Sequence, residues 1–191
     1  MMEKGKYMPF FKSLPEDATP AAIYTKYPEI YKAWSQMSQA TMNGPSPLNP
    51  SERELIFAFS AGVSGCEFVY VAHSEVAYAL GIENGLIERL LQNIENTNVE
   101  KPLKALLIFA RKLMLTPNSL LQEDADKVFN EGWNEQALHD VIAIVARASF
   151  MQRLVSGHGL KPMTREVSTN RAKQRIEHGY VNLYPKFREE K

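Results

Sequence analysis

Apolar residues recur at helical spacing along most of this chain, and residues 101–115 show the pattern most clearly. Within that segment the apolar positions are Leu103, Leu106, Leu107, Ala110 and Met114. No segment of useful length alternates apolar and polar residues as a β-strand does, and the sequence contains no glycine-rich phosphate loop. The sequence therefore predicts an all-α fold.

Prolines and glycines divide this pattern into separate helices. A helix is predicted over residues 21–41 with a break at Pro28, and three prolines place a loop at residues 44–50. A last helix is predicted over residues 164–178. Its charged residues, which usually indicate a solvated face, are Arg165, Glu166, Arg171, Lys173 and Arg175.

The length of 191 residues suits one domain with an appended arm. We expect an N-terminal arm over residues 1–20 and a helical domain over residues 21–191. Because Phe10, Phe11 and Leu14 are too apolar for a free tail, the arm should pack on its own domain or on a neighbouring subunit.

The composition excludes several classes of protein. The 22 basic and 22 acidic residues cancel, so neither nucleic acid nor an anionic membrane surface is an expected partner. The chain has no apolar run of membrane-spanning length and no apolar signal-peptide core, so a cytoplasmic location is expected. A single cysteine excludes an intramolecular disulfide and makes a cysteine-based metal site unexpected; no cofactor is predicted.

That cysteine, Cys66, is followed seven residues later by His73. On a helix Cys66, Val69 and His73 share one face. Ser64 and Glu67 fit a capping box, which would begin the helix at Ser64 and place Cys66 in its first turn. Because the helix N-terminus favours a thiolate, Cys66 and His73 form a candidate redox site.

Each of the candidate residues also has a structural interpretation. Ser51 and Glu54 fit a second capping box, so Glu54 is either a cap, a catalytic residue or both. His73 lies in an apolar stripe, where a histidine is commonly a hydrogen-bonded core residue. A lone cysteine such as Cys66 commonly packs as a small apolar residue.

The Cys66 segment resembles the active-site segment of the AhpD-like, or carboxymuconolactone decarboxylase-like, family of peroxidase-related proteins. Redox members of that family carry a glutamate on one helix and Cys-x-x-Cys-x-x-x-His at the start of the next. Here Glu54, Cys66 and His73 match the glutamate, the first cysteine and the histidine, whereas Val69 replaces the second cysteine.

The resemblance extends from about residue 20 to residue 180. It includes the segment 27–34, the segment 107–117 and the segment 138–154, which are similar to the entry, middle and long helices of peroxidase-related members. It implies an AhpD-like helical domain, in which several helices pack around a buried helix pair that carries Glu54 and the Cys66/His73 motif.

Three functions are compatible with these residues, and the resemblance favours a peroxidase-related oxidoreductase of altered type. In that enzyme a peroxide would oxidise Cys66 to a sulfenic acid, and an external thiol would reduce it again. His73 and Glu54 would act as a proton relay through water, because i and i+7 are roughly 10 Å apart along a helix.

The second function is that of a non-redox enzyme of the decarboxylase branch, acting on a small organic acid. Glu54, His73 and Arg153 could serve it if they converge on one pocket. Ser149 and Gln152, which are polar residues on an apolar face, either line such a pocket or form interhelical hydrogen bonds.

The third function is that of a protein without catalysis that keeps the fold as a binding or assembly module. The resemblance implies a homo-oligomer, and the apolar arm suits one.

Overall fold

The computed structural model describes residues 8–184. This part of the chain is helical and contains no β-strand, as the sequence predicts. The α-helices are α1 (Pro20–Lys26), α2 (Pro28–Asn43), α3 (Pro50–Val63), α4 (Glu67–Ala79), α5 (Leu86–Gln92), α6 (Lys101–Leu115), α7 (Gln122–Asn130), α8 (Glu135–Gly157) and α9 (Arg165–His178), with a 3₁₀ turn, η1, at Pro117–Ser119. No helix within the described residues is both long and apolar enough to cross a bilayer.

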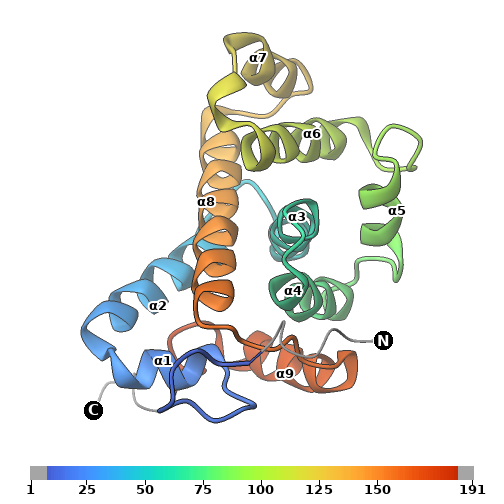
Figure 1. The fold of residues 1–191 in the computed structure, drawn as a ribbon. Helices are drawn as coiled ribbons and strands as arrows, with labels where there is room; N and C mark the ends of the chain where they lie inside the picture. The colour runs from blue at the N-terminus through green and yellow to red at the C-terminus, as the bar shows by residue number, and fades with distance from the viewer. Residues whose placement is uncertain (1–7, 185–191) are drawn as a thin grey trace.

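Helices α3 and α4 lie at the centre of the molecule, with α5, α6, α8 and α9 around them (Figure 1). Every residue from 53 to 61 of α3 is buried, which is expected of a helix enclosed on all sides. The prediction of a buried helix pair surrounded by other helices is therefore confirmed. The pair carries Glu54 on α3 and His73 on α4.

Helix α3 begins two residues earlier than the sequence pattern suggested. Asn49 accepts a hydrogen bond from the backbone N–H of Glu52 at 2.9 Å, and the Glu52 carboxylate accepts one from the N–H of Asn49 at 2.8 Å. Pro50 occupies the first helical position, where its missing N–H costs nothing. The predicted Ser51–Glu54 capping box is wrong, and the Glu54 side chain is free to face the interior.

Helix α4 also begins differently from the prediction. Its N-cap is Cys66 rather than Ser64, and the Ser64 hydroxyl donates back to the carbonyl of Ala61 at 2.9 Å. Gly65, with φ of +72°, makes the tight turn between α3 and α4. The Ser64–Glu67 capping box is therefore absent, and Cys66 lies just before the first turn of the helix.

The described part of the arm contacts its own domain, although the side chains of Phe10 and Phe11 remain 65% and 40% exposed. The N–H of Phe10 donates to the carbonyl of His158 at 3.1 Å, and the ring centres of Phe11 and His158 are 4.9 Å apart. Leu14 is half-buried against the core. Residues 1–7 of the arm and residues 185–191 of the domain lie outside the described residues, and the division of the chain at residue 20 stays a prediction.

The segment after α9 returns to the core. Gly179 has φ of +65°, and a Cβ there would collide with the side chain of Gln39. The next N–H, that of Tyr180, donates to Gln39 at 2.7 Å. On the outer side of α9, Arg165 pairs with Glu75 at 2.9 Å and with Glu88 at 2.7 Å. These contacts hold α9 against α4 and bring Tyr180 to Glu54.

Candidate active site

Glu54 and His73 form a buried pair between α3 and α4. One carboxylate oxygen of Glu54 lies 2.7 Å from Nδ1 of His73, and the other accepts a hydrogen bond from the Tyr180 hydroxyl at 2.6 Å. Glu54 and His73 are each 4% exposed. The structure thus joins two of the three predicted site residues and adds Tyr180, which the sequence analysis missed.

The charges around this pair fix its protonation. Burial lowers the pKa of His73 to about 3; Glu54 opposes this shift, whereas the positive charges of Arg175 and Arg147 add to it. Burial alone would raise the pKa of Glu54, but its bonds to His73 and Tyr180 and the charge of Arg175 bring that pKa below its usual value. At neutral pH His73 is therefore uncharged, with its Nδ1–H donating to the Glu54 carboxylate and Nε2 unprotonated.

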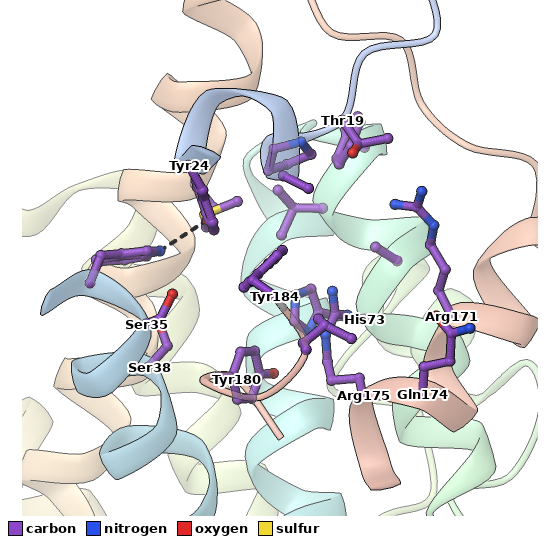
Figure 2. A pocket seen from close by; sticks show the side chains of 18 of the residues that line it. Thr19, Tyr24, Ser35, Ser38, His73, Arg171, Gln174, Arg175, Tyr180 and Tyr184 are labelled. Carbon is purple, nitrogen blue, oxygen red and sulfur yellow. Dashed lines mark hydrogen bonds between the residues drawn. The ribbon is translucent and has the colours of Figure 1, made fainter. Parts of the chain in front are cut away.

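His73 lines a cavity of about 220 Å³ that is enclosed by α1, α2, α4, α8, α9 and the segment after α9 (Figure 2). Val69 and Ala72 line the same wall. Glu54 is not part of the lining, since it lies behind His73. No hydrogen bond from the described residues reaches Nε2 of His73, so a molecule in the cavity could accept or donate a proton at that atom.

Cys66 lies apart from this arrangement. It is 6% exposed, does not line the cavity, and makes no hydrogen bond to His73 or Glu54 within the described residues. Burial raises the pKa of its thiol, although the backbone N–H groups of Val69 and Phe68 lower it by a smaller amount. The expectation that the helix N-terminus favours a thiolate at Cys66 is wrong, because desolvation outweighs it.

Three arginines line the cavity: Arg147 of α8 and Arg171 and Arg175 of α9. The expectation of a solvated face on the last helix is therefore wrong for Arg171 and Arg175. The sequence held a signal for Arg147, which is spaced at helical intervals from Ile144 and Met151 on the buried face of α8. A charged residue on such a stripe needs a partner.

The polar residues that the sequence suggested near the end of α8 do not reach the cavity. Arg153 is exposed and donates to the carbonyl of Ser149 at 2.9 Å. Gln152 donates to the carbonyl of Ser64 at 3.0 Å, and Ser149 donates to the sulfur of Met114 at 3.4 Å. The interhelical interpretation of Ser149 and Gln152 is confirmed, and their role and that of Arg153 in a pocket is not.

Metal ligands are not gathered at this site. Within residues 8–184 no group of three or more His, Cys, Asp or Glu side chains is placed to hold a metal ion.

The sequence matches no protein-family model and no curated protein. Among solved structures it is similar to an uncharacterized peroxidase-related protein from Silicibacter sp. TM1040, with a TM-score of 0.71, 22% identity and 76% of each chain covered. It is also similar to an uncharacterized peroxidase-related protein with an alkylhydroperoxidase AhpD core from Ralstonia eutropha JMP134, with a TM-score of 0.70, 19% identity, and 77% of this chain and 76% of that chain covered.

A third similar structure is a cysteine-to-alanine variant of the debrominase Bmp8 in complex with 2,3,4-tribromopyrrole, with a TM-score of 0.68, 16% identity and 83% of each chain covered. The chain thus has the AhpD-like helical fold that its sequence suggested. At these identities the likeness concerns the fold, and proteins that share a fold differ widely in activity.

Proposed function

We propose that this protein is an AhpD-like enzyme that transfers protons to and from a small organic acid without redox chemistry. The observation that carries the proposal is the Glu54–His73 pair, in which His73 lines a cavity and its Nε2 has no hydrogen-bond partner among the described residues. His73 is the general base and then the general acid, and Glu54 holds its tautomer and stabilises the imidazolium. Tyr180 positions Glu54 through its hydroxyl.

The reaction class that fits this pair is proton transfer at carbon, as in isomerisation or decarboxylation of an acid. In an isomerisation Nε2 of His73 removes a proton from one carbon and returns it to another. In a decarboxylation Nε2 of His73 relays a proton from water to the carbanion that remains when CO₂ leaves, so the reaction consumes one proton from solvent and His73 ends neutral, as it began. Neither course consumes an oxidant or uses Cys66.

The experiment follows hydrogen–deuterium exchange and CO₂ release by NMR, in D₂O, for a panel of small keto, unsaturated and aromatic acids. It compares the wild type with His73→Gln and, as the matched control, Cys66→Ala. We expect His73→Gln to lose roughly 10²–10⁴-fold in rate, the usual contribution of a positioned acid–base group, and Cys66→Ala to keep its activity. Equal rates in the wild type and His73→Gln would refute the proposal.

A second candidate is a peroxidase-related oxidoreductase that uses Cys66 as a single thiol. Two observations favour it: the fold neighbours are called peroxidase-related, and Cys66 receives backbone hydrogen bonds at the start of α4. Its reaction needs a peroxide and an external thiol reductant, and Cys66 would pass through a sulfenic acid.

The test for this candidate is peroxide consumption with a dithiol reductant by the wild type, Cys66→Ala and Val69→Cys. Turnover by the wild type that Cys66→Ala abolishes would establish a single-thiol peroxidase. An inert wild type together with an active Val69→Cys would identify a disabled dithiol centre. A protein inert in both this assay and the proton-transfer assay would be a binding or assembly module.

A further inference from the structure

Arg147 is a buried cation without an acidic partner in the described part of the chain. Its side chain is 4% exposed and forms no salt bridge there. Its Nε donates to the hydroxyl of Ser38 at 3.0 Å, whereas its Nη1 is buried and has no hydrogen-bond partner among residues 8–184. An unpaired buried guanidinium is costly for a folded protein, so an anion bound beside it would be stabilising.

Two aromatic rings lie close to that guanidinium. The guanidinium carbon of Arg147 lies 4.4 Å from the ring centre of Phe57 and 4.5 Å from that of Tyr180. These cation–π contacts stabilise the charge, but a ring face cannot accept the in-plane N–H bonds of a guanidinium. A carboxylate is the group that meets the edge of a guanidinium, with two parallel hydrogen bonds.

Arg175 supplies a second positive charge to the same place. Its guanidinium carbon lies 5.6 Å from the Tyr180 ring centre, so it is within about 10 Å of that of Arg147. Its Nε is also buried without a partner. The carboxylate of Glu54 offsets part of the charge of Arg175, but within the described residues it forms no salt bridge with either arginine, and one carboxylate cannot balance two guanidinium groups.

The wall formed by α1, α2 and α8 is aromatic and satisfies its own polar atoms. The Trp34 N–H donates to the Tyr24 hydroxyl at 3.1 Å, as the dashed line in Figure 2 shows. That hydroxyl in turn donates to the sulfur of Met151 at 3.3 Å. What remains for a ligand on this side is apolar ring and thioether surface, which suits a flat hydrocarbon body.

We propose that this cavity binds a small aromatic carboxylate, whose anionic group pairs with Arg147 and Arg175. The aromatic body of the ligand lies against Tyr24 and Trp34. The statement that this carboxylate is also the substrate rests on the proposed function, but its binding can be measured without turnover.

The bound carboxylate would also act on His73. In the empty cavity the charges of Arg147 and Arg175 disfavour the imidazolium. A carboxylate between these arginines offsets their charge, so the base becomes stronger when its ligand is present.

The experiment is calorimetric titration of the wild type with benzoate and with benzamide, which has nearly the same shape and no charge. We expect benzoate to bind at least 10-fold more tightly than benzamide. Arg147→Met should weaken benzoate binding by roughly 10- to 150-fold, the range for charge-assisted hydrogen bonds, while circular dichroism shows an intact fold. The matched control is Arg153→Met, an exposed arginine on the same helix, which should bind benzoate like the wild type.

Equal affinity of the wild type for benzoate and benzamide would overturn the inference. The absence of measurable binding at about 10 mM benzoate would also overturn it, because a site with a Kd of about 1 mM would be mostly occupied at that concentration. Unchanged benzoate binding by a folded Arg147→Met would also overturn it. If that variant does not fold, the comparison of benzoate with benzamide on the wild type decides the question. His73→Gln separates this inference from the proposed function: it should bind benzoate and lack proton transfer. Benzoate binding without any turnover would refute the enzyme and leave the anion site standing.

Discussion

Replacing Tyr180 by Phe tests whether the buried Glu54 carboxylate depends on the C-terminal segment. The substitution removes only the hydroxyl that donates to Glu54 at 2.6 Å. A hydrogen bond to a charged group contributes about 1.5–3 kcal/mol, and the oxygen left behind is buried without a second donor. We therefore expect the free energy of unfolding to fall by about 2–3 kcal/mol at pH 7.

The assay is urea unfolding at pH 7, supported by thermal unfolding, in which this loss corresponds to a decrease in Tm of roughly 4–12 °C for a chain of this size. Tyr31→Phe is the matched control. Tyr31 is 7% exposed, and no hydrogen bond to its hydroxyl exists within the described residues. Its replacement should change the free energy of unfolding by less than about 0.5 kcal/mol.

The difference in stability between the wild type and Tyr180→Phe should also depend on pH in a defined direction. The Tyr180 bond helps to lower the pKa of Glu54 in the folded protein. A carboxyl group with a lowered folded pKa adds stability above its unfolded pKa of about 4.3 and loses it as the pH falls through the folded value. The difference between the wild type and Tyr180→Phe should therefore shrink below about pH 4.3. A difference under about 0.5 kcal/mol at pH 7 would refute the role assigned to Tyr180.

Three further predictions concern other parts of the site. Because Cys66 is buried and burial raises its pKa, an aromatic disulfide reagent at pH 7 should label it at least 10-fold more slowly in the native protein than in urea; equal rates would contradict its burial. The NMR signals of His73 should not titrate between pH 5 and 8, because its folded pKa is about 3. Because the unfolded chain binds this proton at a pKa of about 6.5, the contribution of His73 to the free energy of unfolding should decrease as the pH falls from about 6.5 towards 3. An inflection of the His73 NMR signals near pH 6.5 would contradict the prediction. Gly179→Ala should destabilise the fold by more than about 1 kcal/mol, because a φ of +65° with a ψ of −157° is a conformation that essentially only glycine adopts. A loss below about 0.5 kcal/mol in urea unfolding would contradict this.

The helices were predictable because apolar spacing is a local property of the chain. The first residue of α3 was not, because two capping patterns overlap there. Asn49 and Glu52 compete with Ser51 and Glu54 for the start of α3, and Pro50 decides between them, since only the earlier start places the proline at the first helical position.

The site could be predicted only in part, for a related reason. Glu54 and His73 were predicted because two segments of the sequence resemble a family motif, and the structure places these residues in contact on adjacent helices. Tyr180 follows the last helix, and nothing near it in the sequence indicates a contact 126 residues away. Arg171 and Arg175 carry the same charge as the solvated residues beside them, so only the position of α9 distinguishes them.

The long-range contact of Tyr180 also makes the site depend on a segment that is synthesised long after Glu54. During synthesis Glu54 emerges 126 residues before Tyr180, so the carboxylate has no phenol donor until α9 and the segment after it have been made. Until α9 covers α4, Glu54 and His73 remain hydrated and the cavity has no wall on that side. The packing of α9 on α4 therefore completes the site, and a chain arrested before Gly179 would contain the α3–α4 pair without the wall that α9 and Tyr180 supply.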